Sequence, residues 1–159
     1  MKKSTLLIAL VVLSFVAFSA AFSQTTANQT ATITVGAVQK LAVTGSPSLT
    51  IGNTEATAGT DLLASVTSPE ACTYSFTHNG ATAEKITASI PTVLAKGKLE
   101  VKFGAGSYVD ISNATTAVDI KTGIAKGAGT EAIVYQLSGI KASDGTISDS
   151  KVVTFTLTN

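Results

Sequence analysis

The chain of 159 residues contains no arginine and no tryptophan, and it has one cysteine and one histidine. All eleven basic residues are lysines, set against ten acidic residues. A protein that binds nucleic acid needs clustered lysine and arginine, so this composition argues against that class. One histidine and one cysteine cannot build a classical structural zinc site. The missing tryptophan also disfavours glycosidases and carbohydrate-binding modules, which stack aromatic rings on sugars.

The N-terminus has the order of a secretory signal peptide. Lys2 and Lys3 precede an apolar run over residues 6–17, and small residues then lead to Ala21-Phe22-Ser23. This order predicts cleavage of residues 1–23 and a life outside the cytoplasm, either secreted, at the cell surface or in the periplasm. The alternative is an uncleaved membrane anchor, for which the apolar run is borderline in length. After cleavage we expect no membrane span.

Removal of 23 residues from 159 leaves 136, about one domain. Two lysines leave with the signal, so nine face ten acids and the formal net charge becomes −1. A domain of this length can bury a core without disulfides. In the stretch 72–77, Cys72 alternates onto the same face as Tyr74 and Phe76. This pattern predicts a buried cysteine, and an intermolecular disulfide is the alternative.

Apolar and polar residues alternate with a period of two along the rest of the chain, which indicates half-buried β-strands. The clearest case is Lys98 to Phe103, where Leu99, Val101 and Phe103 share one face. Residues 132–135 are apolar on both faces, which predicts a central strand. The final residues alternate Val153, Phe155 and Leu157 with threonines and predict the closing strand. The complete set of predicted strands is 31–35, 40–44, 48–51, 62–66, 72–77, 85–90, 98–103, 117–121, 131–137 and 151–159.

Turn residues agree with this pattern. Asn79-Gly80 predicts a hairpin between the strands 72–77 and 85–90. Glycines at 104–106 and 127–129, and Asp144-Gly145, separate the later strands. Nine or ten short strands in one domain predict an all-β fold, a two-sheet immunoglobulin-like sandwich with Greek-key connections. We expect it to cover residues 31–159, after a flexible polar segment over 24–30; a small closed β-barrel is the alternative.

The second half of the chain carries a resemblance to a known group. It contains a Thr-Ala-x-Asp-hydrophobic segment from Thr116 to Ile124, a strand with a central tyrosine at Tyr135, and a closing valine-threonine strand. These features resemble a group of uncharacterised secreted bacterial proteins with immunoglobulin-like sandwich domains. More distantly the layout is similar to pilin-like and spore-coat-like subunits, although the disulfide usual in chaperone-assembled pilins is missing. The resemblance implies a fold and an extracytoplasmic location, and it implies no catalytic residue.

We find no pattern of residues that predicts a catalytic, cofactor-binding or metal site. Gly123-x-x-x-Gly127-x-Gly129 is followed by a strand, whereas a phosphate-binding loop opens a helix. His78 precedes Asn79-Gly80 and is predicted to be a turn residue. The stretch from Asp144 to Asp149 could offer oxygen ligands to calcium, but Asp-Gly and Ser-Asp are also ordinary turn pairs.

The sequence therefore predicts a non-enzymatic structural or surface protein, with no cofactor and no nucleic-acid partner. Its strand candidate at 31–35, with Ala31, Ile33 and Val35 on one face, follows a polar segment and could pair within its own domain or with another subunit. Pairing with another subunit would give a homo-oligomer or filament built by strand addition. The alternative function is an adhesin or a module that binds carbohydrate or protein through its loops, with Tyr108 as the best candidate for an exposed aromatic residue.

Overall fold

The computed structural model describes residues 27–69 and 71–159. The predicted signal peptide over residues 1–23 and the first part of the polar segment 24–30 lie outside the described residues. The chain divides into two units, Met1–Val35 and Gly36–Asn159, and both sheets belong to the second. No helix in the described ranges is long and apolar enough to cross a lipid bilayer.

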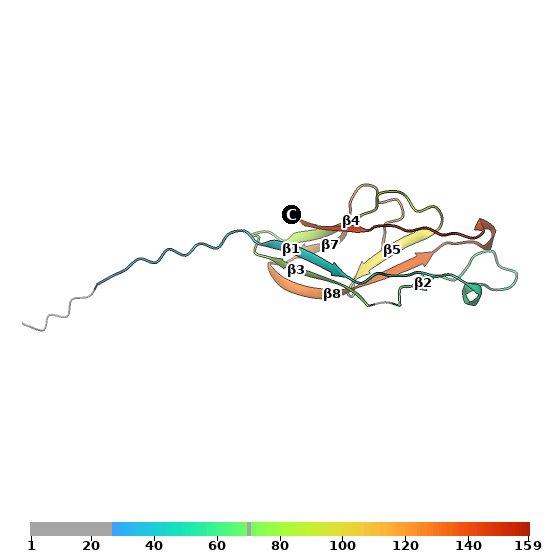
Figure 1. Cartoon of the computed structure of the whole chain (residues 1–159), viewed down its shortest axis with the longest axis horizontal. Coiled ribbons are helices and arrows are strands. Elements are labelled where there is room, and N and C mark those ends of the chain that lie inside the picture. The colour runs from blue at the N-terminus through green and yellow to red at the C-terminus, as the bar shows by residue number, and fades with distance from the viewer. Residues whose placement is uncertain (1–26, 70) are drawn as a thin grey trace, which may run out of the picture. The chain divides into compact units, whose positions relative to one another are not determined.

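The first sheet has six strands, and its longest strand lies at the centre (Figure 1). β8 (Gly127–Ser138) pairs with β3 (Cys72–His78) and β5 (Lys98–Phe103), and also with the two-residue β2 (Val66–Thr67). β1 (Gln39–Thr44) and β6 (Val109–Asp110) form the edges, and all pairs are antiparallel. Residues 132–135 lie inside β8, so the predicted central strand is confirmed.

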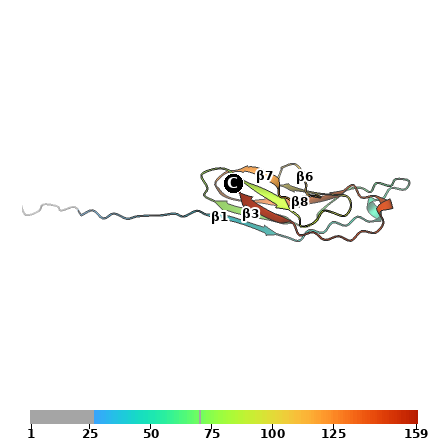
Figure 2. The same ribbon diagram turned by 90° about the horizontal axis from the view of Figure 1, so that it is seen from above.

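The second sheet has three antiparallel strands, with β4 (Glu84–Ser89) between β7 (Val118–Ile124) and β9 (Thr154–Thr158). In Figure 2, β7 lies on the side opposite β1 and β3. Two short 3-10 helices, η1 (Asn53–Glu55) and η2 (Ala142–Asp144), interrupt the loops. The sheets do not close on each other, so the predicted two-sheet sandwich is confirmed and the closed barrel is wrong.

The core lies between the two sheets and contains residues from both. Tyr74 on β3 stacks on Phe103 on β5 at 4.3 Å between ring centroids, and Phe103 contacts Phe155 on β9 at 5.3 Å. Phe155 therefore joins the second sheet to the first. Burial of such rings and of aliphatic side chains is the main stabilising term for the sandwich. The other fully buried apolar residues include Cys72, Ile86, Ala88, Val101, Ile111 and Ile133, and the predicted burial of Cys72 is confirmed.

Three predicted strands are wrong. Residues 31–35 and 48–51 form no strand, although both alternate apolar and polar residues. Residues 62–66 contribute one isolated bridge, from Leu62 to Lys141, before β2 begins at Val66. Alternation favours a strand only where a second strand completes the hydrogen-bond ladder, and no described residue does so for 31–35 or 49–51.

The predicted hairpin at Asn79-Gly80 is also wrong, because β3 and β4 belong to different sheets. Residues 79–83 carry the chain across the sandwich instead, as Greek-key connections do. The glycines at 127–129 do not end a strand but open β8. Gly129 pairs with Phe76, whose ring lies 2.7 Å from where a Cβ would stand at position 129. A glycine here leaves room for that ring, which explains its place inside a strand.

Candidate functional site

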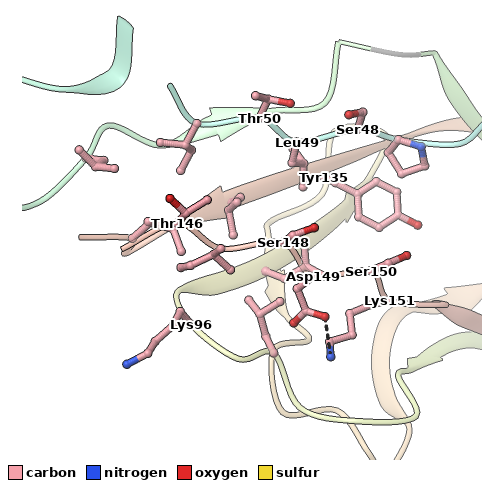
Figure 3. A pocket seen from close by; sticks show the side chains of 18 of the residues that line it. Ser48, Leu49, Thr50, Lys96, Tyr135, Thr146, Ser148, Asp149, Ser150 and Lys151 are labelled. Carbon is pink, nitrogen blue, oxygen red and sulfur yellow. Dashed lines mark ion pairs between the residues drawn. The ribbon is translucent and has the colours of Figure 1, made fainter. Parts of the chain in front are cut away.

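The most distinctive surface of the sandwich is an edge where its two sheets leave a gap. After β1, residues 46–51 continue along the border of the first sheet, and residues 146–153 lead into β9 at the border of the second. We call these two segments together the open edge. A groove with a volume of about 650 Å³ lies between them (Figure 3).

The groove has a mixed lining, in which apolar side chains lie among serines, threonines and charged residues. Leu49 and Ile51 come from one segment of the open edge, and Ile147 and Val153 come from the other. Between them lie side chains from the interior of the first sheet and its loops, namely Leu63, Leu94, Leu99, Tyr135, Leu137 and Ile140. In Figure 3, Leu49 and the ring of Tyr135 lie between the two segments. Burial raises the pKa of the Tyr135 hydroxyl to about 12, so the ring is neutral at physiological pH.

The rim of the groove carries charges that are paired with one another. Lys151 Nζ lies 3.0 Å from Asp149 Oδ1 and donates a hydrogen bond to Thr92 Oγ1, also at 3.0 Å. The hydrogen bond from Lys151, and a second from the Ala95 amide, lower the pKa of Asp149. Lys96 forms a longer pair with Asp144 at 3.4 Å. The charged groups that line the groove are therefore paired, and its other polar lining residues are uncharged serines and threonines.

Much of the backbone of the open edge has no ladder partner among the residues that the structure describes. Among the described residues, no backbone-to-backbone hydrogen bond reaches residues 49–51 or 146–153. Further along β9, the Leu157 carbonyl points to the same side, where it accepts a hydrogen bond from the Gln39 side chain at 3.2 Å and not from another strand. In a strand, alternate residues direct their backbone groups to the same side. Phe155 and Val153 therefore also present N–H and C=O groups to the open side.

The described part of the N-terminal unit is exposed throughout. Residues 27–35 form no helix or strand, and each of them is solvent-exposed. The side chains of Ile33 and Val35 are 86% and 78% exposed, the two highest values among the large exposed apolar residues. Apolar side chains this exposed are unfavourable in water unless another surface covers them.

Asn79 fixes the chain where the sandwich begins. Its side chain accepts a hydrogen bond from the Val38 amide at 2.7 Å and donates one to the Gly36 carbonyl at 2.8 Å. Its backbone amide donates to the Val38 carbonyl at 3.1 Å. Asn79 follows His78, the partner of Gln39 in the ladder. Residues 36–38 are thus held at the Gln39 end of β1, and the open edge begins at its other end.

His78 is buried rather than part of a turn, so that prediction is wrong. Only 2% of its surface is exposed, and its Nε2 lies 2.8 Å from the Ala125 carbonyl. Glu84, the first residue of β4, accepts a hydrogen bond from Gln39 Nε2 at 3.0 Å. His78, Glu84 and Gln39 form a polar cluster that joins the two sheets. The alternation of Cys72, Tyr74 and Phe76 continues to His78, and this is the signal that could have placed it inside.

The other candidate residues do not come together. Tyr108 is half-buried, and Lys102 Nζ lies 4.8 Å from its ring centroid. Asp144 accepts a hydrogen bond from the Lys141 amide and caps η2, whereas Asp149 lies at the rim of the groove. Gly123 lies in β7, and the element that follows it is the strand β8, not a helix. Within residues 27–69 and 71–159, no three His, Cys, Asp or Glu side chains are grouped as metal ligands would be.

Comparison of the chain with protein-family models, with curated proteins and with solved structures finds no match.

Proposed function

We propose that this protein is a non-enzymatic, extracytoplasmic structural subunit that assembles with further copies of itself by β-strand addition. The added strand is residues 31–35. One observation carries the proposal: this segment alternates like a strand, yet it belongs to neither sheet, and Ile33 and Val35 are almost fully exposed. In strand addition, backbone hydrogen bonds provide affinity and alternate side chains enter pockets of the acceptor.

The composition of this region supports the same role. From Gln24 to Gln39 the sequence contains no charged residue. Natural proteins discourage pairing at exposed strands by placing lysine or other charges on them. The absence of such charges over sixteen successive positions favours a segment that pairs with another strand. The surrounding glutamines, threonines and asparagine keep it compatible with water until it does.

The experiment uses the exported protein, purified after secretion from a bacterial host. Oligomers are separated by electrophoresis without boiling and viewed by electron microscopy. The variant Ile33→Asp/Val35→Asp places two charges on the apolar face of the segment. We expect it to lower the oligomer fraction at least tenfold, because two carboxylates would have to be buried on assembly.

The matched control is Thr32→Asp/Thr34→Asp, which adds the same charges to the opposite face. We expect this control to assemble nearly as well as the wild type, since period-two geometry directs Thr32 and Thr34 away from an acceptor. A wild-type protein that remains monomeric at all concentrations, with no filaments in the microscope, would refute the proposal. Equal losses in both variants would show that charge alone, and not a strand, governs assembly.

A binding module that recognises carbohydrate or protein through its loops is the alternative, and it has weaker support. Tyr108 was the aromatic residue expected to offer a stacking surface. Its ring already faces Lys102, which leaves less of it available to a sugar. Screening the protein on a glycan array, with Tyr108→Ala as the comparison, tests this function directly.

A further inference from the structure

The open edge has the properties of a sandwich from which one strand is missing. Two chain segments border it. Residues 49–51 of the first segment and residues 146–153 of the second form no backbone-to-backbone hydrogen bond with any described residue. Unpaired N–H and C=O groups along two facing segments are a template for an additional strand. We infer that this open edge is the acceptor for residues 31–35 of a second copy of the chain. The inference rests on the proposed function and names the surface on which it acts.

The chemistry of the groove matches that segment. Its lining combines aliphatic side chains and Tyr135 with uncharged serines and threonines, and Asp149 and Lys151 are paired with each other. The segment offers Ala31, Ile33 and Val35 on one face, spaced about 6.6 Å apart in an extended chain. These side chains would enter the groove, and Thr32 and Thr34 would face water. A charged strand would instead have to lose its hydration against the apolar part of that lining.

The segment cannot reach the groove of its own chain. Asn79 holds Gly36 and Val38 at the Gln39 end of β1, and the groove lies beyond Thr44 at the other end. Crossing the six residues of β1 requires about 17 Å between the first and last Cα atoms. Ile33 lies three positions before Gly36, and a fully extended chain covers at most about 11 Å over three positions. Only a second copy can therefore place Ile33 in the groove.

The remaining sheet edges are less suited to accept a strand. β1 carries Lys40, β6 carries Asp110, and β7 carries Asp119. Charges on an edge oppose its pairing with another chain. By contrast, residues 46–51 contain no charged residue, and neither does β9. Asp149 and Lys151, the two charges in the other segment, form an ion pair with each other at 3.0 Å, as Asp119 on β7 does with Lys85 on the neighbouring strand.

Disulfide trapping tests the acceptor directly. The double variants Thr34→Cys/Thr50→Cys and Thr34→Cys/Ser148→Cys pair an outward position of the segment with an exposed position on each side of the groove. None of the substituted residues is apolar, so the apolar side chains of the segment and of the groove are left intact. We therefore expect each variant to fold, and thermal melting checks this. We expect at least one of them to form, on mild oxidation, a ladder of covalent dimers, trimers and longer species in denaturing electrophoresis.

Two control variants use the other edges, Thr34→Cys/Ala42→Cys on β1 and Thr34→Cys/Asp119→Cys on β7. We expect these to yield less than a tenth of the ladder. A ladder confined to the controls would overturn the groove as acceptor while leaving strand addition by residues 31–35 in place. A covalent monomer, closed within one chain, would overturn assembly between copies. Wild-type protein that never oligomerises would remove the proposed function as well, so the two failures are distinguishable.

Discussion

Nδ1 of His78 lies 3.2 Å from Oε1 of Glu84, and both side chains are almost completely buried. The orientation of the two groups is not that of a hydrogen bond, and Nδ1 has no hydrogen-bond partner among the described residues. The two side chains therefore make a close polar contact that is not a hydrogen bond. It joins the end of β3 in one sheet to the start of β4 in the other, at the point where residues 79–83 cross between them.

The first prediction concerns this contact. Glu84→Ala should lower the free energy of unfolding by about 3 kcal/mol, because it removes a buried carboxyl that contacts the buried His78 ring and accepts a hydrogen bond from Gln39. Urea denaturation measures the loss. Lys85→Ala is the control, since Lys85 forms an exposed pair with Asp119 at 3.0 Å and should cost less than about 1 kcal/mol. Equal losses of unfolding free energy in the two variants would show that the buried contact stabilises the fold no more than the exposed ion pair does.

The second prediction compares two isoleucines. Ile86 on β4 is fully buried, whereas Ile33 is 86% exposed. Ile86→Ala should lower the free energy of unfolding by about 2–5 kcal/mol, through lost burial and a cavity between the sheets. Ile33→Ala should change the stability of the monomer by less than about 0.5 kcal/mol. Chemical denaturation at low protein concentration checks both, and a large effect of Ile33→Ala on the monomer would mean that residues 31–35 pack within their own chain.

The third prediction concerns Gly97, which adopts a φ of +74°. A Cβ at this position would overlap the side chain of Ile140 and would lie 2.8 Å from the Ser138 carbonyl oxygen. Gly97→Ala should destabilise the fold by about 1–3 kcal/mol, since the strained backbone and the steric overlap act together. Gly36→Ala is the control, because nothing lies within 4 Å of its Cβ position. Thermal melting should separate the two variants clearly.

The fourth prediction concerns acid stability. Lys121 on β7 donates a hydrogen bond to Glu131 on β8 and lowers the pKa of that carboxyl below its ordinary value of 4.5. A folded-state pKa below the unfolded value means that the unfolded chain takes up the proton first as pH falls. The contribution of Glu131 is complete above its unfolded pKa and is lost as pH falls through the folded value.

Glu131→Gln should therefore lose less stability than the wild type between about pH 5 and about pH 3. Denaturant midpoints across this range give the comparison, and near neutral pH the variant should be the less stable of the two. Lys121→Met should flatten the same part of the curve, because it removes the cause of the shifted pKa. Parallel acid curves for wild type and Glu131→Gln would contradict the assignment.

The sequence predicted the class of fold because alternation and pairing coincide over most strands. Leu99, Val101 and Phe103 alternate, and β5 has neighbours on both sides. Leu49 and Ile51 alternate as well, but no described strand completes a ladder beside them. Periodicity reports which face of a segment is apolar, and it does not report which neighbour, if any, is available. The open edge could therefore not be predicted from local pattern.

His78 and the glycines of β8 were misplaced for a related reason. Asn79-Gly80 has the composition of a tight hairpin, but β3 and β4 on either side of it belong to different sheets. Gly129 reads as a turn residue because nothing in its own neighbourhood shows that Phe76 packs against it. In both cases a contact distant in the sequence decides the local structure. The buried Cys72 and Tyr135 needed no such information, because apolar faces were sufficient to place them.

The hydrogen bonds of Asn79 to Gly36 and Val38 have a mechanical consequence. If residues 31–35 occupy a neighbouring copy, the tether between successive subunits has almost no slack, since Val35 adjoins a held residue. Bending and torsion would then be resisted at every junction, and the fibre would behave as a stiff rod with a fixed helical repeat. The Asn79 side chain supplies two of the three hydrogen bonds at this junction, so Asn79→Ala, which keeps only the backbone bond to Val38, would give more flexible fibres.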